Sequence, residues 1–236
     1  MKEKINLYCL PFAGGSSYSY NVFTPHLSSN VNLVPVELPG RGKRSREALL
    51  NEADLMADDV FAKIKSNLVS GVPYAIFGHS MGGLLGYLLT RKILENNLPL
   101  PLHLFISGRS GPSYNDDREK YYLLPKQEFR DKLKELGGSP KEVLENDDLM
   151  DFFEPILRAD FQVVETYNHQ EEAPFSVPAS IMIGDEDKIS LEAARLWQKE
   201  TSQPIKLHSF TGGHFFVFQH LTSICKIISA ELDNTL

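Results

Sequence analysis

The sequence predicts an α/β domain with a mostly parallel central sheet flanked by helices. Short runs rich in β-branched and aromatic residues alternate with helix-like segments, and most of these runs are apolar throughout. The alternation predicts βαβ units, and uniformly apolar strands are typical of a sheet covered on both faces. A length of 236 residues suits a single domain of this class, so we expect one unit over 1–236.

The expected strands are bounded by turn-forming residues and lie at 5–10, 31–36, 74–77, 102–107, 179–183 and 205–210. Between them, Met56, Val60, Ile64 and Leu68 recur every four residues and form the apolar stripe of a helix. Further helices are expected at 81–95, 190–201 and 219–232.

The region 109–175 breaks this alternation. It contains consecutive amphipathic patterns at 125–136, 140–145 and 147–167, separated by Gly137-Gly138 and Asn146. We interpret it as a helical lid inserted into the domain. The alternative is an ordinary set of surface helices that elaborates the sheet.

Residues 78–82 read Gly-His-Ser-Met-Gly, which matches the G-x-S-x-G nucleophile elbow. In this motif a strand turns sharply into a helix and exposes the serine hydroxyl at the sheet edge. An apolar run precedes the motif and leucines at helical spacing follow it, as strand-turn-helix requires. The pattern predicts an α/β-hydrolase fold with Ser80 as nucleophile.

A serine hydroxyl needs a histidine base that is oriented by a carboxylate. Both residue types follow in that order: Asp187 lies in the loop after the strand at 179–183, and His214 lies in a Gly-Gly-His turn after the strand at 205–210. Loops at the carboxyl ends of parallel strands share one edge of the sheet, so the three side chains can meet there. Asp185 and Glu186 occupy the same loop, and Asp185 is the alternative acid.

Acyl transfer also needs backbone donors for an oxyanion. The Met81 amide follows the nucleophile, and the loop Pro-Phe-Ala-Gly-Gly at 11–15 offers the second donor. We favour the Ala13 amide, with Phe12 as the alternative. Neither a G-x-G-x-x-G motif nor a P-loop lysine is present, and no Cys/His cluster has metal-ligand spacing, so we expect no cofactor and no metal.

The composition restricts the partners. A net charge of −7 and a pI near 5.5 argue against nucleic acid. No stretch approaches the length of a membrane span and no signal peptide is evident, so we expect a cytoplasmic protein that does not bind membranes. We also expect it to be a monomer. Cys9 and Cys225 each lie in an apolar run, which favours buried thiols over a disulfide.

Taken together, the motifs closely resemble those of type II thioesterases, the discrete partners of nonribosomal peptide and polyketide synthases. The resemblance spans nearly the whole chain and rests on LPFAGG (10–15), ELPGRG (37–42), FGHSMGG (77–83), SGR (107–109), GDED (184–187) and GGHFF (212–216). It implies hydrolysis of stalled or misprimed acyl groups from the 4'-phosphopantetheine arm of carrier proteins. Motif by motif, it assigns the nucleophile to Ser80, the acid to Asp187 and the base to His214.

Three alternatives remain open at this point. A carboxylesterase or lipase of the same fold would use the same chemistry, a free-standing thioesterase could release finished products, and a non-catalytic relative could act as a scaffold. An intact Ser, acid and His in the expected order argues against the scaffold.

Two further expectations concern substrate and carrier. We expect Phe12 and Phe215 to contact substrate, and the inner face of the 109–175 region to bind the acyl chain through Leu133, Leu136, Leu149, Phe152, Phe153, Ile156 and Phe161. The loop 41–46 holds Arg41, Lys43, Arg44 and Arg46, and could dock the acidic carrier or the phosphate of its arm. The alternative for this loop is a structural turn held by Arg41.

Overall fold

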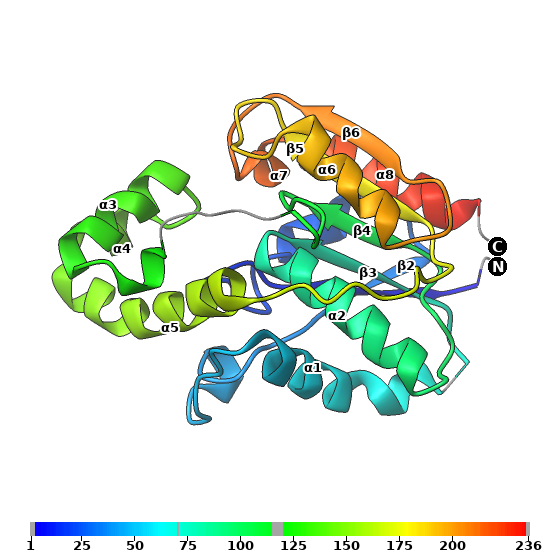
Figure 1. The fold of residues 1–236 in the computed structure, drawn as a ribbon, viewed down its shortest axis with the longest axis horizontal. Coiled ribbons are helices and arrows are strands. Elements are labelled where there is room, and N and C mark those ends of the chain that lie inside the picture. The colour runs from blue at the N-terminus through cyan, green and yellow to red at the C-terminus, as the bar shows by residue number, and fades with distance from the viewer. Residues whose placement is uncertain (1–2, 70, 115–119, 235–236) are drawn as a thin grey trace.

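The structure is a computed structural model and describes residues 3–69, 71–114 and 120–234. Across these ranges, six parallel strands form one sheet in the order β2-β1-β3-β4-β5-β6 (Figure 1). The strands are β1 (Ile5–Leu10), β2 (Val31–Pro35), β3 (Tyr74–His79), β4 (Leu104–Ser107), β5 (Ala179–Gly184) and β6 (Lys206–Phe210). The predicted α/β-hydrolase architecture with a mostly parallel sheet is confirmed.

Strand burial follows position in the sheet. The inner strands β3, β4 and β5 are buried at every residue, whereas the edge strands β2 and β6 are partly exposed. Side chains alternate between the two faces, so Tyr8 and Leu10 enter one core cluster while Leu7 and Cys9 enter the other. The apolar composition of the strands is therefore explained by helices on both faces.

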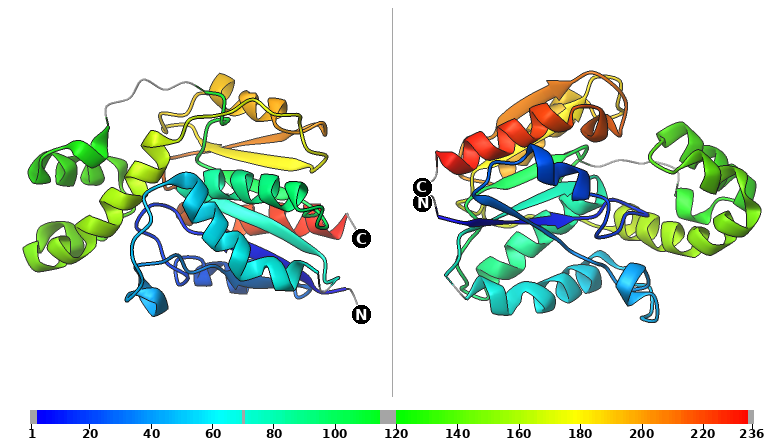
Figure 2. Two further views of the ribbon diagram at one scale, coloured as in Figure 1. Left: turned by 60° about the horizontal axis from the view of Figure 1, so that its bottom comes forward. Right: turned by 180° about the vertical axis from the view of Figure 1, so that it is seen from behind.

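Helices cover the two faces unequally. Helices α1 (Ala53–Leu68), α2 (Met81–Glu95) and α6 (Leu191–Arg195) pack in the first cluster, and α8 (Leu221–Asp233) packs with the 3-10 helix η1 (Asn21–His26) in the second. Figure 2 shows α8 and η1 on the face opposite α1 and α2. Among the described helices, none combines the length and apolarity needed to cross a membrane.

The strand order changes direction at β1, which pairs with β2 on one side and β3 on the other. In doubly wound sheets the crevice at the carboxyl ends of two such strands is the usual ligand position. The loop after β1 and the turn after β3 both emerge there. These two connections hold the predicted oxyanion loop and Ser80.

Between β4 and β5 the chain forms the 3-10 helix η3 (Tyr121–Leu123) and helices α3 (Lys126–Leu136), α4 (Lys141–Glu145) and α5 (Asp147–Thr166), which we call the helical segment. It has an apolar cluster of its own, made of Phe129, Leu133, Leu144, Met150 and Leu157. Figure 1 shows it beyond the carboxyl edge of the sheet, on the side away from the start of β1. Residues 115–119 of the predicted 109–175 region lie outside the described residues.

Two helices differ from their predicted extents. The helix expected at 190–201 is α6 followed by the 3-10 helix η4 (Leu196–Lys199), whose buried Trp197 donates from its indole N–H to the Arg109 carbonyl at 2.9 Å. The helix expected at 219–232 is preceded by α7 (Phe216–Gln219), and His220 between them leaves helical geometry at φ −115° and ψ 30°. Cys9 and Cys225 are buried free thiols.

Candidate active site

Ser80 occupies a strained turn between β3 and α2. Its backbone φ of 54° and ψ of −113° lie in a region that residues other than glycine rarely adopt. The Ser80 amide donates to the Ser107 carbonyl of β4 at 2.8 Å, and the Ser80 carbonyl accepts from Leu84 at 3.3 Å as α2 begins. Hydrogen bonds on both sides therefore hold the serine at the sheet edge.

The two glycines of the motif are required by close backbone approach. A Cβ on Gly78 would lie 2.0 Å from the Gly82 carbonyl oxygen, and a Cβ on Gly82 would lie 2.1 Å from the Leu10 carbonyl oxygen. Real side chains do not tolerate such distances, so only glycine fits at either position. The strained turn is thus closed against both its own helix and β1.

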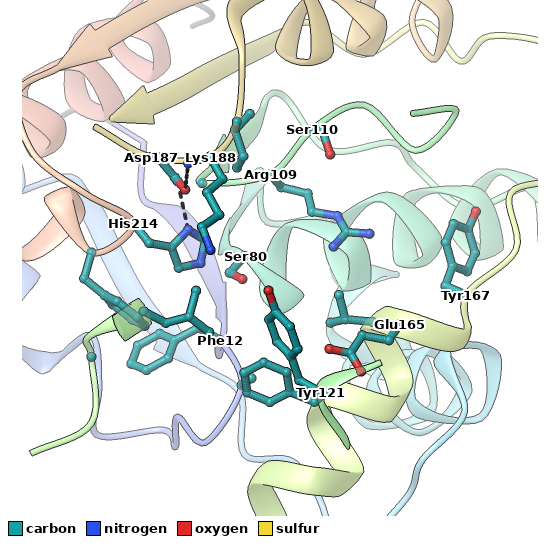
Figure 3. A pocket seen from close by; sticks show the side chains of 18 of the residues that line it. Phe12, Ser80, Arg109, Ser110, Tyr121, Glu165, Tyr167, Asp187, Lys188 and His214 are labelled. Carbon is teal, nitrogen blue, oxygen red and sulfur yellow. Dashed lines mark hydrogen bonds and ion pairs between the residues drawn. The ribbon is translucent and has the colours of Figure 1, made fainter. Parts of the chain in front are cut away.

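The structure places Asp187 and His214 in direct contact. His214 Nδ1 lies 2.8 Å from Asp187 Oδ2, and the other Asp187 oxygen accepts from the Lys188 amide at 2.7 Å. Both side chains are mostly buried, with 17% of His214 and 6% of Asp187 exposed. Figure 3 shows the imidazole lying between Asp187 and Ser80, which is the order of groups that a serine hydrolase uses.

Asp185 has a different partner. Its Oδ1 accepts from the Gly212 amide at 2.9 Å, while its own amide donates to the Phe210 carbonyl at 2.8 Å. Asp185 therefore ties the loop after β5 to the loop after β6 instead of contacting His214. The geometry favours Asp187 over Asp185 as the acid.

His79, at the variable position of the elbow, is fully buried beneath His214. Its Nδ1 lies 3.0 Å from the Ser107 hydroxyl, and its ring centroid lies 5.0 Å from that of His214. Burial, together with the neighbouring His214, holds the pKa of His79 well below its ordinary value. His79 is consequently a neutral packing group behind the base.

The loop after β1 forms a tight turn in which the Gly15 amide donates to the Phe12 carbonyl at 2.8 Å. Within the described part of the chain, nothing accepts a hydrogen bond from the Ala13 amide. The Met81 amide, at the first position of α2, likewise has no acceptor inside its helix. The Met81 amide follows Ser80 directly, and Ala13 lines the same cavity as Ser80.

These groups open into a cavity of about 530 Å³. The catalytic loops contribute Phe12, Ala13, Ser80, Asp187, His214 and Phe215 to its wall. The facing wall comes from the helical segment and includes Leu133, Leu136, Leu157, Phe161 and Val164. Polar side chains also line it, among them Arg109, Ser110, Glu165, Asn168 and Lys188 (Figure 3).

The residues predicted to contact substrate separate into two groups. Phe12 and Phe215 line the cavity with ring centroids 5.1 Å apart. On the helical segment, Leu133, Leu136 and Phe161 also line it.

The prediction for the helical segment is wrong at Leu149 and Phe152, which are 40% and 65% exposed. The inward stripe of α5 runs through Leu157, Phe161 and Val164 at spacings of four and three residues, and Leu149 and Phe152 fall beside that stripe. Ile156 is buried and Phe153 packs on the segment's own cluster, and neither is among the residues that line the cavity.

Two of the four basic side chains in the loop 41–46 form ion pairs within the fold. Arg41 is 4% exposed and pairs with Asp160, and Arg44 is bound by Asp59 and Glu47. The prediction of a docking patch is therefore wrong for these two residues. Lys43 and Arg46 remain exposed.

The sequence did not indicate the Arg41–Asp160 pair or the polar residues of the cavity wall. Glu165 Oε2 accepts from the Tyr122 amide at 3.1 Å, and Lys188 Nζ lies 2.7 Å from Glu135 Oε1 of α3. These contacts join elements that are distant in sequence, so no local pattern reports them. In the described residues, no group of His, Cys, Asp and Glu side chains has the arrangement of a metal site.

The thioesterase domain family model matches residues 5–232. One relative is the gramicidin S biosynthesis protein GrsT of Aneurinibacillus migulanus, which is 29% identical over 97% of this chain and 89% of its own length. Another is thioesterase PikA5 of Streptomyces venezuelae, which is 32% identical over 97% of this chain and 81% of its own length.

Solved structures agree with this assignment. ClbQ from the colibactin NRPS/PKS pathway has a TM-score of 0.93 and 32% identity, covering 99% of this chain and 98% of that one. The type II thioesterase BorB from the borrelidin cluster has a TM-score of 0.89 and 30% identity, covering 98% and 94%. The chain therefore belongs to the thioesterase family of the α/β-hydrolase fold and is a thioester hydrolase of the type II class.

Proposed function

We propose that the protein hydrolyses acyl thioesters on the 4'-phosphopantetheine arms of carrier proteins, removing stalled or aberrant acyl groups during nonribosomal peptide or polyketide synthesis. One observation carries the proposal: the strained Ser80 opens into the same cavity as the Asp187–His214 pair, in a chain of the thioesterase family. The pathway follows from the names of the relatives, which include gramicidin S biosynthesis and the colibactin NRPS/PKS pathway.

Acylation of Ser80 is the first half of the proposed reaction. Ser80 Oγ attacks the thioester carbonyl while His214 Nε2 takes the hydroxyl proton, and Asp187 stabilises the imidazolium through Nδ1. The C–S bond then breaks, His214 returns the proton to the departing sulfur, and the phosphopantetheine thiol leaves. The acyl group remains on Ser80 as an ester.

Deacylation repeats the sequence with water. The water oxygen attacks the ester carbonyl while His214 takes a proton from the water. The C–Oγ bond then breaks, and Ser80 Oγ recovers its proton from His214. The acyl group leaves as a carboxylic acid. In both halves the Met81 and Ala13 amides would stabilise the negative oxygen of the tetrahedral intermediate.

The helical segment is proposed to act as a lid, inserted in a single domain, that forms the acyl side of the cavity. Its apolar residues Leu136 and Phe161 suit an alkyl chain, while Glu165 of α5 and Arg109 after β4 add charged side chains to the cavity lining. We therefore expect acyl groups with polar substituents to be accepted along with simple chains.

The test is the replacement Ser80→Ala, assayed by thiol release from carrier proteins loaded with acetyl, aminoacyl and medium-chain acyl groups. Turnover should fall by roughly 10³-fold or more, as for other triad serines, with little change in thermal stability. Ser66→Ala, on the exposed side of α1, is the matched control. Residual turnover within about tenfold of wild type would remove Ser80 as nucleophile, and preferential hydrolysis of oxygen esters would favour a carboxylesterase.

A further inference from the structure

A buried ion pair joins the helical segment to the loop after β1. Asp160 of α5 is fully buried, and both of its oxygens accept from the Arg41 guanidinium at 2.6 Å. Arg41 is only 4% exposed and lies in the loop after β2. The pair therefore links α5 to a loop that precedes it by 119 positions.

The same two side chains bind the backbone of Gly14 and Gly15. The Gly14 amide donates to Asp160 Oδ2 at 2.7 Å, and the Gly15 carbonyl accepts from Arg41 at 3.2 Å. Asp160 thus receives three hydrogen bonds from two separate loops. Both ends of the Gly14–Gly15 turn are therefore held by buried charged groups.

Packing fixes the turn at the same point. Gly14 has a φ of 77°, and a Cβ at that position would lie 2.6 Å from Leu157 Cδ2, one helical turn before Asp160 on α5. The loop therefore rests directly on α5 at Gly14, with an apolar contact and a hydrogen bond side by side.

The position of the Ala13 amide depends on this arrangement. The hydrogen bond from Gly14 to Asp160 fixes the peptide plane between Ala13 and Gly14, and the Gly15 amide closes the turn onto the Phe12 carbonyl. An oxyanion donor must lie close to where the negative oxygen forms, so small rotations of this turn would weaken it.

We infer that Asp160, together with Arg41, is a positioning residue that sets the Ala13 amide of the oxyanion hole and makes that hole depend on the docking of α5. This inference rests on the proposed function. Fold stability alone does not require the pair, because buried ion pairs can often be replaced by apolar side chains without loss of stability. Here Asp160 and Arg41 form hydrogen bonds with the backbone of Gly14 and Gly15, the two residues that follow the proposed donor Ala13.

The experiment compares Asp160→Leu, which removes the acceptor for the Gly14 amide, with the double variant Asp160→Leu/Arg41→Met, which leaves no unpaired buried charge. Steady-state kinetics use one acyl-carrier substrate, and the concentration of competent sites is counted with a fluorophosphonate. We expect kcat to fall about 10- to 100-fold in both variants with KM nearly unchanged, because the lost contact acts on the transition state. A boronic acid that mimics the tetrahedral intermediate should lose affinity by a similar factor.

A matched control separates positioning from stability. Arg91→Gln breaks another buried ion pair, with Glu200 at 3.2 Å, away from the Gly14–Gly15 turn. It should lower the melting temperature without changing kcat per competent site. In the double variant, stability should recover relative to Asp160→Leu while kcat stays low.

Two results would overturn the inference. One is kcat and boronate affinity of Asp160→Leu within about threefold of wild type. The other is a recovery of kcat in step with stability in the double variant, which indicates a structural role only. The proposed function fails on a different result, namely full activity of Ser80→Ala.

Discussion

Asp185 and Asp187 belong to one loop but have different hydrogen-bond partners. Asp187 Oδ2 lies 2.8 Å from His214 Nδ1, whereas Asp185 Oδ1 accepts from the Gly212 amide at 2.9 Å. A carboxylate on Nδ1 keeps the proton there and leaves Nε2 free to accept a proton from the nucleophile. A carboxylate on a backbone amide only shapes the turn.

We therefore predict that Asp187→Asn lowers kcat strongly, by roughly 10³- to 10⁴-fold, because an amide favours the wrong imidazole tautomer. Asp185→Asn should lower kcat much less, since an amide oxygen still accepts from Gly212. Steady-state kinetics of both variants on one acyl-carrier substrate provide the measurement. A larger loss in Asp185→Asn than in Asp187→Asn would assign the acid role to Asp185.

At the scale of single residues, the motifs indicated which catalytic side chains lie in the loops after the strands, but not which side chains of the helical segment contact those loops. Ser80, Asp187 and His214 could be predicted because chain order and loop position constrain them, and the structure brings them to one cavity. Asp160 could not, because its partners lie 119 and 146 positions away. The one available signal was an aspartate on the buried stripe of α5, between Ile156 and Val163.

At the scale of elements, the helical segment meets the catalytic loops at its Gly-Gly turn. A Cβ on Gly138 would lie 2.1 Å from the Phe215 ring, so α3 ends directly against the residue that follows His214. Lys188, next to Asp187, pairs with Glu135 of α3 at 2.7 Å. The wall that faces Ser80 therefore contacts both of these loops.

We expect Leu136→Trp to reduce kcat/KM for medium-chain acyl substrates by about tenfold more than for acetyl, because a larger side chain fills the cavity. Leu136→Ala should shift the preference toward longer chains. Competition assays with mixed acyl-carrier substrates measure the ratio directly. Leu149→Trp, on the exposed side of α5, is the control, and an equal change in both tryptophan variants would contradict a chain-length role for this wall.

Elements buried on a periodic stripe were predictable, and irregular ones were not. The stripe of α1 and the leucines of α2 follow directly from burial against the sheet. The 3-10 turn at η4 and the break at His220 depend on tertiary contacts, such as the hydrogen bond from Trp197 to the Arg109 carbonyl. Local propensity does not contain that information.

At the scale of the whole molecule, two buried histidines connect folding to pH. Burial holds the pKa of His79 well below its ordinary value and lowers that of His103 to about 4. In the unfolded chain both should titrate near 6.5. Below that pH the unfolded state binds protons that the folded state does not, so the free energy of unfolding decreases as the pH falls.

We predict a loss of about 1.4 kcal/mol per pH unit for each of these histidines between about pH 6 and pH 5. Urea unfolding at several pH values measures the slope. His103→Gln should reduce this slope by the contribution of one proton. The glutamine amide can keep the contact with the Ser180 hydroxyl, which lies 2.9 Å from His103 Nε2 in the wild-type protein. His26→Gln, at an exposed site, should match wild type. A stability that does not change over this range would refute the prediction.

The fold class could be predicted as a whole because alternating apolar strands and amphipathic helices permit few arrangements. The strand order could not, since the pairing of β1 with both β2 and β3 depends on contacts between distant segments. That order nevertheless decides where the site lies. It places the Ala13 loop and Ser80 at the same crevice.

The ties between the loops after β5 and β6 have a consequence for the energy of catalysis. The Glu186 backbone amide donates to the Gly212 carbonyl at 3.0 Å and the Asp185 carboxylate accepts from the Gly212 amide, so hydrogen bonds join the two loops. Asp187 belongs to one loop and His214 to the other. Their alignment is therefore complete before a substrate arrives, and little reorganisation energy remains when the imidazolium forms. Binding energy from the thioester substrate is then left for orienting its carbonyl rather than for bringing Asp187 and His214 together.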